Sequence, residues 1–259
     1  MLKGKTALVT GSTSGIGLAI AEALAGEGAN IVMNGFGDAG EIEKMRQGIE
    51  ARGGEAAYDG TDMSDPAAIE GMVNGAIDRF GGVDILVNNA GIQHVAPLED
   101  FPAERWDAVI AINLSAVFHT TRHAIAGMKE KGWGRIVNIA SVQGLIGSVH
   151  KAAYVAAKHG VNGLTKVTAL EAAESGVTCN AICPGWVLTP LVQKQIDAFA
   201  AERGLDDEAA KREFLAQRTP TKRFVTPEQI GGLTVYLCSP AADNMTGTQL
   251  PIDGAWVAQ

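Results

Sequence analysis

Residues 6–17 read TALVTGSTSGIG, a short apolar run followed by glycines at positions 11, 15 and 17. The run Thr6–Thr10 predicts a buried strand, and the apolar residues of Leu18–Glu27 recur at helical spacing up to Gly28. A glycine turn between a strand and a helix lets the backbone approach a pyrophosphate, whose charge the helix N-terminus stabilises. We therefore interpret this stretch as the first βα unit of a dinucleotide-binding fold. The alternative is a tight turn that holds no ligand.

The rest of the chain alternates strand candidates with helical stretches. We expect strands at Ile31–Asn34, around Ala56–Tyr58, and at Ile85–Asn88, Arg135–Ala140, Val177–Ile182 and Gln249–Ile252. This order predicts an α/β fold, a Rossmann-like doubly wound parallel sheet of about seven strands with helices on both faces. The chain has 259 residues, of which 46% are hydrophobic, so we expect one domain over residues 1–259. Residues 188–224 are charged and helical without a strand, which favours a substrate lid.

Composition narrows the classes of function. The net charge of -8 argues against nucleic-acid binding and provides no general attraction for an anionic substrate. No apolar stretch approaches the ~20 residues that span a bilayer, and nothing resembles a signal peptide, so we expect a cytoplasmic protein without a membrane partner. Cys179 and Cys183 would lie ~13 Å apart on one strand, beyond the ~7 Å limit for a disulfide. With Cys238 isolated, we expect three reduced thiols, and we expect no metal site.

Three side chains in the middle of the chain form a pattern typical of hydride-transfer enzymes. Tyr154 and Lys158 are four residues apart and share one face of a helix, and Ser141 precedes Tyr154 by thirteen residues. Lowering the pKa of a phenol by ~3 units takes ~4 kcal/mol. One ammonium ~5 Å away supplies ~3 kcal/mol at an effective dielectric near 20, and less in water. We expect Tyr154 to remove the substrate's hydroxyl proton, Lys158 to stabilise the phenolate, and Ser141 to hold the substrate oxygen.

These motifs resemble the short-chain dehydrogenases/reductases, in order and over essentially the whole chain. The matching positions are Thr10-Gly11-xxx-Gly15-Ile16-Gly17, Asn88-Asn89-Ala90-Gly91, Asn113, Ser141, Tyr154-xxx-Lys158 and Pro184-Gly185. The resemblance implies a homotetramer and a catalytic tetrad of Asn113, Ser141, Tyr154 and Lys158. Asn113, in an expected helix over Trp106–Thr121, would anchor a water that links Lys158 to solvent; the alternative is a buried Asn bonded only to backbone. The implied cofactor-binding residues are Gly11, Thr13, Gly15, Ile16, Gly17, Phe36, Asp62, Met63, Asn89, Ala90, Gly91, Tyr154, Lys158, Pro184, Gly185 and Val187.

The choice between NAD and NADP depends on the end of the second strand, where residues 34–38 read NGFGD. A 2′-phosphate needs a cationic partner there. Neither this stretch nor Ser12–Ser14 carries one, so NAD(H) is favoured. Phe36 either packs against the adenosine or fills a crevice at the surface.

Within the family, the chain is most similar to the D-3-hydroxybutyrate dehydrogenases, which interconvert D-3-hydroxybutyrate and acetoacetate in ketone body metabolism. The similar stretches are residues 34–37, 88–94, 114–119, 151–160, 182–186 and 189–195. The resemblance places a carboxylate on Gln93, Lys151 and Gln195, and the methyl end of the substrate between Trp186 and Trp256. Each side chain alone also fits a solvated surface position or core packing. The implied substrate-binding residues are Gln93, Ser141, Gln143, Lys151, Tyr154, Trp186, Gln195 and Trp256.

Three positions depart from that subfamily's pattern. Gln143 stands where His is usual, His150 stands where an uncharged residue is usual, and Ala255 replaces a second Gly before Trp256. Gln143 donates hydrogen bonds but cannot become cationic, so we expect a lower affinity or an altered preferred acid. His150 is expected to be solvated; the alternative is that it restores positive charge to the pocket.

Two other functions fit parts of the pattern. A 3-oxoacyl carrier-protein reductase has the same tetrad, but normally uses NADPH and needs an open cleft. Residues 188–224 carry seven basic and six acidic residues, which gives little attraction for an acidic carrier protein. A catalytically silent nucleotide-sensing regulator can dispense with the base, whereas all four residues of the tetrad are present here.

Overall fold

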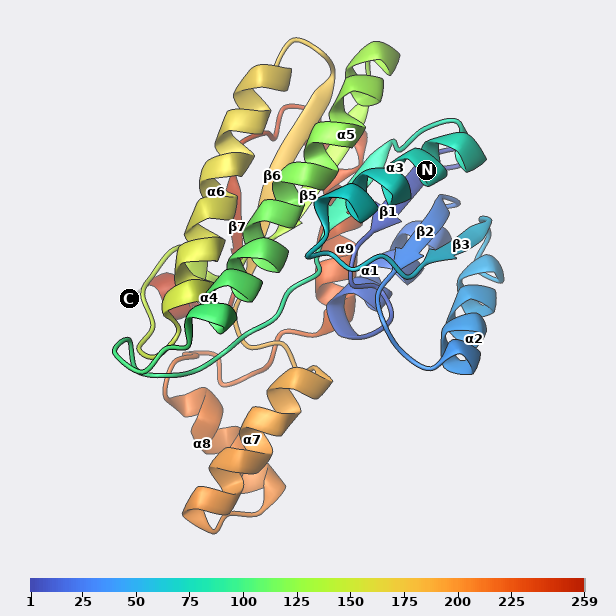
Figure 1. Ribbon diagram of the computed structural model, residues 1–259. Coiled ribbons are helices and arrows are strands. Elements are labelled where there is room, and N and C mark those ends of the chain that lie inside the picture. The colour runs from blue at the N-terminus through green and yellow to red at the C-terminus, as the bar shows by residue number, and fades with distance from the viewer. Residues whose placement is uncertain (259) are drawn as a thin grey trace.

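The computed structural model describes residues 1–258, and within them seven strands form one parallel sheet in the order β3-β2-β1-β4-β5-β6-β7 (Figure 1). The strands are β1 (Thr6–Val9), β2 (Asn30–Asn34), β3 (Ala56–Asp59), β4 (Ile85–Asn88), β5 (Gly134–Ile139), β6 (Val177–Pro184) and β7 (Gln249–Ile252). All seven predicted strands are confirmed. β6 runs further than predicted because Cys183 and Pro184 pair with Pro251 and Ile252 of β7.

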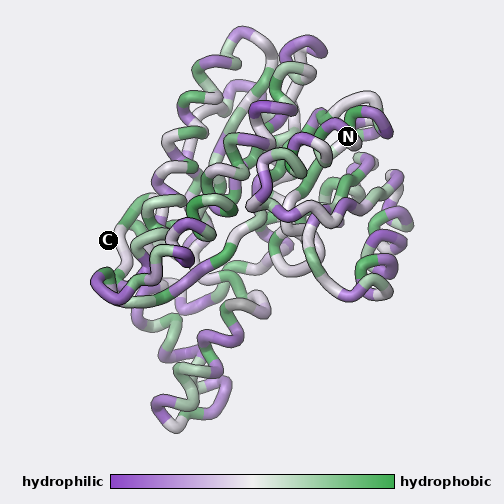
Figure 2. Tube along the Cα trace, in the orientation of Figure 1, coloured by the Kyte–Doolittle hydropathy of each residue, from purple (hydrophilic) through white to green (hydrophobic). Residues whose placement is uncertain are grey.

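Helices cover both faces of the sheet, as the doubly wound fold requires. They are α1 (Gly15–Gly26), α2 (Ala39–Glu50), α3 (Pro66–Phe80), α4 (Ala103–Ile110), α5 (Ala116–Lys131), α6 (Ala152–Ala172), α7 (Pro190–Arg203), α8 (Asp207–Ala216) and α9 (Pro227–Leu237). α1 packs against α9 on one face, and α3, α5 and α6 lie on the other (Figure 1). Successive strand residues serve opposite faces: Leu8 and Val32 pack with the α3–α5 layer, whereas Val9 and Met33 pack with α1 and α9. Figure 2 shows hydrophobic residues running through the sheet between these layers.

The helix expected over Trp106–Thr121 is interrupted, which corrects the sequence-based prediction. α4 ends at Ile110, a π-helical stretch occupies Ala111–Ser115, and α5 continues from Ala116. A π-helical turn accommodates an extra residue and often marks a functional position. Asn113 lies in the middle of this stretch.

The 188–224 insert projects beyond the carboxyl edge of the sheet and contains α7 and α8 (Figure 1). Its two ends meet: Val187 and Val225 form an isolated parallel bridge, and the Val225 N–H donates to the Trp186 oxygen at 2.9 Å. The insert has a small apolar core of its own, in which Ile196 is fully buried. None of the helices in residues 1–258 is both long enough and apolar enough to span a bilayer.

Candidate active site

A cavity of about 420 Å³ opens at the carboxyl ends of β1, β4, β5 and β6, next to the first turns of α7. This edge is where open α/β sheets bind their ligands. Its wall includes every predicted cofactor and substrate residue except Gly17, and it does not include Asn113. The residues predicted to bind cofactor and substrate therefore line one cavity, with Gly17 as the exception.

The glycine turn between β1 and α1 is shaped to receive an anion. Gly11 and Gly15 have φ angles of +63° and +55°, a region that only glycine adopts readily. A Cβ at Gly11 would lie 2.9 Å from the Ala90 Cα, so the chain leaves no room for a side chain. Ser14 makes no side-chain cap, and the first turn of α1 holds no acidic residue. The free N–H groups of this helix start suit a pyrophosphate.

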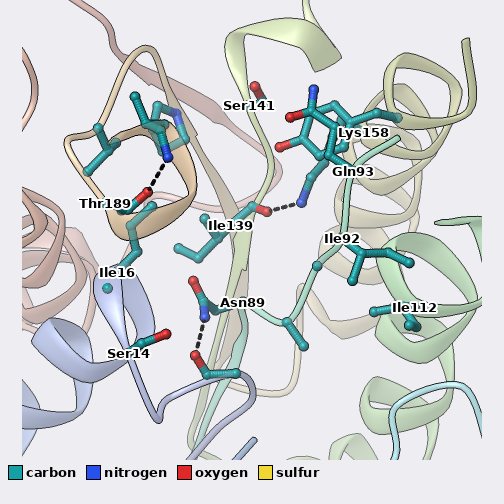
Figure 3. A pocket seen from close by; sticks show the side chains of 18 of the residues that line it. Ser14, Ile16, Asn89, Ile92, Gln93, Ile112, Ile139, Ser141, Lys158 and Thr189 are labelled. Atoms are coloured by element: carbon teal, nitrogen blue, oxygen red, sulfur yellow. Dashed lines mark hydrogen bonds between the residues drawn. The ribbon is translucent and has the colours of Figure 1, made fainter. Parts of the chain in front are cut away.

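Asn89, in the cavity wall, and Gly17, behind it, both support this turn. The Asn89 amide donates to the Thr10 and Gly11 oxygens at 2.9 and 3.0 Å. Figure 3 draws one of these two bonds. A Cβ at Gly17 would collide with the Gly11 oxygen and the Asn89 amide, so glycine is needed there for packing. Gly17 thus supports the site from behind the wall.

The opposite end of the cavity from Tyr154 is formed by the turn after β2. Asn34 is buried and structural: its amide donates to the Thr61 oxygen at 3.0 Å and accepts from the Gly11 N–H at 3.3 Å. Thr13 donates to the Phe36 oxygen at 2.9 Å, and the Phe36 ring is 67% exposed. The cationic residues in the described wall are Lys151 and Lys158, and both lie away from this end.

Tyr154 and Lys158 lie one turn apart on α6. The Lys158 Nζ is 5.5 Å from the centroid of the Tyr154 ring and donates to the Ile139 oxygen at 2.7 Å (Figure 3). Burial lowers the pKa of Lys158 to about 8. Burial also raises the pKa of Tyr154 to about 12, although a hydrogen bond from Ser141 acts in the opposite direction. The phenol is therefore a proton donor at pH 7, and it becomes a base only with further positive charge beside it.

Ser141 is held at the start of a short 3-10 turn, Val142–Gly144, that follows β5. The Gln143 N–H donates to the Ser141 Oγ at 3.1 Å. This bond uses one of the two acceptor positions of the hydroxyl and leaves its proton free to be donated, which agrees with the hydrogen bond from Ser141 that lowers the pKa of Tyr154. Ser141, Tyr154 and Lys158 are consequently arranged to bind one substrate oxygen and exchange a proton with it.

The Asn113 side chain is bonded to backbone and does not reach the cavity. Its Nδ2 donates to the Ile92 oxygen at 3.0 Å, and the Ile92 N–H donates to its Oδ1 at 2.9 Å. These two bonds fix the Gly91–Ile92 segment of the cavity wall against the π-helical stretch. These are the contacts of the alternative interpretation, a buried Asn bonded only to backbone, and the water relay through Asn113 stays a prediction.

The end of the cavity beyond Tyr154 combines cationic and aromatic side chains. The Lys151 Nζ lies 5.3 Å from the centroid of Trp186, whose ring lies 5.4 Å from that of Trp256. The Arg218 guanidinium, in the insert, is 5.9 Å from the Trp256 centroid. Burial and the like charge of Arg218 lower the pKa of Lys151 to about 8. A desolvated ammonium beside apolar rings is suited to a small carboxylate with a short apolar end.

The three positions that depart from the subfamily pattern lie in different environments. Gln143 is buried in the cavity wall, which also includes the half-buried Gln93 and Gln195. His150 is exposed and lies off the wall, so it adds no charge to the cavity. Ala255, just before Trp256, has a φ of +72°, which is strained for any residue with a Cβ.

Several wall residues were not predicted from the sequence. They are Ser14, Asn34, Gly35, Thr61, Ile92, Ile112, Ile139, Ala140, Val142, Thr189, Pro190 and Val192. Most directly adjoin a predicted motif, so extending each motif by one or two residues would have found them. Ile112 and Val192 carry no polar signal and join the wall only through tertiary packing.

Comparison with known proteins agrees with this geometry. The family model for short chain dehydrogenases matches residues 5–199. The chain is 61% identical over 263 residues to D-beta-hydroxybutyrate dehydrogenase of Cupriavidus necator, with 100% of each chain covered. It is 56% identical over 256 residues to the protein of the same name from Rhizobium meliloti, covering 98% of this chain and 99% of the relative. The crystal structure of levodione reductase matches with a TM-score of 0.92 at 35% identity, covering 100% of this chain and 99% of that one.

Proposed function

The chain belongs to the short chain dehydrogenase family, and on that premise we propose that it interconverts D-3-hydroxybutyrate and acetoacetate with NAD(H) as cofactor. One observation carries the choice of substrate: Lys151 lies in the same cavity wall as Tyr154, beside Trp186 and Trp256. This arrangement supports a carboxylate site near the proton donor. The high identity to two D-beta-hydroxybutyrate dehydrogenases over the full chain supports the same substrate.

In the direction of reduction, Tyr154 donates its phenolic proton to the carbonyl oxygen of acetoacetate. Ser141 holds that oxygen by a hydrogen bond, and Lys158 stabilises the phenolate that remains. The bound nicotinamide supplies the hydride, or accepts it in the reverse direction. Lys151 binds the carboxylate, with Gln93, Gln143 and Gln195 as amide donors, so the reacting carbon is held at a constant distance from Tyr154.

The cofactor is proposed to lie along the glycine turn, with its pyrophosphate at the start of α1. Asp62 and Met63 would contact the adenine end, and Pro184–Val187 the nicotinamide end. NAD(H) is favoured over NADP(H) because the wall near Phe36 and Thr13 carries no cation among the described residues. We expect at least a tenfold preference in kcat/KM for NADH over NADPH. Equal values would exclude this choice of cofactor.

The substrate is tested by measuring NADH oxidation with acetoacetate, 3-oxopentanoate, levulinate and an acetoacetyl thioester. We expect acetoacetate to give the highest kcat/KM, since the free carboxylate is the group that Lys151 recognises. A clear preference for the thioester would instead indicate a 3-oxoacyl carrier-protein reductase. Tight NADH binding without turnover of any of the four compounds would indicate a nucleotide-sensing regulator.

We also propose that the 188–224 insert acts as a lid within a single domain and that the protein works as a cytoplasmic homotetramer. The insert supplies Thr189, Val192 and Gln195 to the cavity wall, which supports a covering role. The tetramer rests on the family resemblance, and sedimentation equilibrium of the purified protein tests it. A monomer at micromolar concentration would contradict it.

A further inference from the structure

A buried polar pair lies behind the cavity wall, between the elements that carry Ser141, Tyr154 and Lys158. Asn162 is on α6, one turn beyond Lys158, and is 6% exposed; Cys183 is near the end of β6 and is fully buried. The Cys183 Sγ lies 3.9 Å from the Asn162 Oδ1 and donates a hydrogen bond to it. Neither residue is part of the described cavity wall.

Asn162 ties α6 to the turn that Ser141 begins. Its Nδ2 donates to the Gly144 oxygen at 2.8 Å, inside the protein. The turn also packs directly on the helix backbone, because a Cβ at Gly144 would lie 2.7 Å from the Lys158 oxygen and 2.9 Å from the Asn162 Nδ2. One side chain therefore holds the segment of Ser141 against the helix of Tyr154 and Lys158.

The two ends of the Asn162 amide face different partners. The amide oxygen accepts from the thiol, so the amide nitrogen is turned toward Gly144. Burial raises the pKa of Cys183 to about 11, so the sulfur keeps its proton and remains a donor at pH 7. A main-chain hydrogen bond from Ser141 lowers this pKa and so acts against the effect of burial. The pair thus contacts β6, α6 and the Ser141 turn together.

We propose that Asn162 is a positioning residue for hydride transfer: oriented by Cys183, it fixes the Ser141 turn to α6 so that the Ser141 hydroxyl reaches the Tyr154 phenol. The expected effect of Asn162 on kcat rests on the proposed function. Its effect on the position of the Ser141 turn does not. A displacement of ~1 Å between reacting groups can cost on the order of 10²-fold in rate. Loss of the Ser141 hydrogen bond also removes the interaction that opposes the rise in the pKa of Tyr154.

The test is Asn162→Leu, which keeps the shape of the side chain and removes its hydrogen bonds. We expect kcat with acetoacetate to fall at least tenfold, while the Kd of NADH stays within twofold because the glycine turn is not involved. In 3-hydroxybutyrate oxidation, activity rises with pH as Tyr154 loses its proton. The midpoint of this rise should move to a higher pH in the variant, since Tyr154 is then harder to deprotonate. Amide hydrogen exchange of residues 141–145 should become at least tenfold faster.

Asn180→Leu is the matched control. Asn180 is equally buried on β6, and its amide donates to the Met245 oxygen at 2.6 Å and accepts from the Thr248 N–H at 3.3 Å, in contacts that do not involve the site. This variant should lose stability while kcat, the pH profile and exchange at residues 141–145 stay as in the wild type. Cys183→Ser keeps a donor and should retain most of kcat, whereas Cys183→Ala should not.

Gly144→Ala disturbs the same contact between the Ser141 turn and α6, this time from the turn. It serves as the test if Asn162→Leu does not fold. The added methyl group would push the turn away from the Lys158 backbone and should reproduce the loss of kcat and the shifted pH profile. Unchanged kcat, pH profile and exchange in the folded variants would overturn the proposal. A wild-type protein that does not reduce acetoacetate would instead refute the proposed function, and the exchange experiment would still decide whether Asn162 holds the turn.

Discussion

The Lys158 amine and the Ile139 carbonyl oxygen are 2.7 Å apart, so the last residue of β5 and a side chain of α6 hold each other in place. This bond uses one of the three ammonium protons and leaves two for ligands or water. It also prevents the cation from swinging away from the Tyr154 ring. The burial that makes this contact strong has a cost, because a charged amine is held out of water.

That cost can be measured by comparing the wild type with Lys158→Met. The pKa of Lys158 falls from 10.5 to about 8 on folding, which corresponds to about 3 kcal/mol of destabilisation below pH 8. Between pH 8 and 10.5 the unfolded chain binds this proton and the folded protein does not, so stability relative to Lys158→Met rises with pH. We expect the difference in urea-derived unfolding free energy to shift by about 2 kcal/mol toward the wild type between pH 7 and 9.5. Burial raises the pKa of Cys183 to about 11 and the loss of Lys158 raises it further, so this thiol stays protonated in both folded proteins up to pH 9.5 and its titration cancels from the difference. Parallel curves of stability against pH would contradict the pKa assigned to Lys158.

Tyr154→Phe should reduce kcat about 10²–10⁴-fold, the usual contribution of a general acid, with little change in the Kd of NADH. Tyr236→Phe is the control, because Tyr236 is exposed and its hydroxyl contacts only Met245 among the described residues. Steady-state turnover and fluorescence titration of NADH separate the two effects. Wild-type turnover in Tyr154→Phe would refute the mechanism.

Binding of a non-reacting acid such as butanoate should weaken as the pH rises through about 8, because Lys151 loses its charge there. Arg218→Gln removes the neighbouring like charge, so the midpoint of this change should move to higher pH. Arg212→Gln, at an exposed position on the same insert, should leave the midpoint where it is. Competitive inhibition constants between pH 6.5 and 9.5 give the midpoints, and identical values for all three proteins would show that Arg218 does not act on Lys151.

Gln143→His should lower the KM for acetoacetate, most clearly at acidic pH, where the imidazole is cationic. Gln143 lies buried in the cavity wall, so a charge introduced there is poorly screened by solvent. The KM is measured at pH 6 and pH 8 for both proteins. If it does not change, the side chain at position 143 does not touch the carboxylate.

Ala255→Gly should stabilise the protein by about 0.5–1 kcal/mol, because glycine adopts a φ of +72° without a steric penalty. Ala198→Gly, on the exposed face of α7, should instead destabilise by about 1 kcal/mol, as glycine does inside a helix. Thermal unfolding of both variants checks the opposite signs. Destabilisation by Ala255→Gly would mean that the Ala255 methyl group makes a packing contact that outweighs its strain.

The sheet could be predicted because each strand is a short buried run with a local signature, and the cavity because parallel strands bring their carboxyl ends to one edge. The π-helical stretch could not. The pattern of residues 106–121 has ordinary helical spacing, and the interruption accompanies the bonds between Asn113 and Ile92, which is a tertiary contact. The same limit explains the error in the length of β6, whose last two residues are paired by a strand about seventy positions later.

Within the site, titratable and glycine residues were predictable because their chemistry is specific to the residue type. The Ile139 carbonyl and the structural role of Asn34 were not, since every residue has a main-chain oxygen and an Asn can bond to any of them. The role of Asn162 could not be predicted for a related reason. Nothing in its sequence context shows that Gly144 and Cys183 will be its neighbours.

The bridge between Val187 and Val225 means that the insert begins just after β6 and ends just before α9 at two adjacent points of the chain. A segment attached in this way can change in length or sequence without moving the end of β5, which precedes Ser141 and whose Ile139 oxygen binds Lys158. Grafting a different insert between these two valines should therefore alter which acid is accepted while the proton and hydride chemistry is inherited intact. The evolution of new substrates on this scaffold is expected to proceed first by exchange of this module, and only later by changes in the sheet.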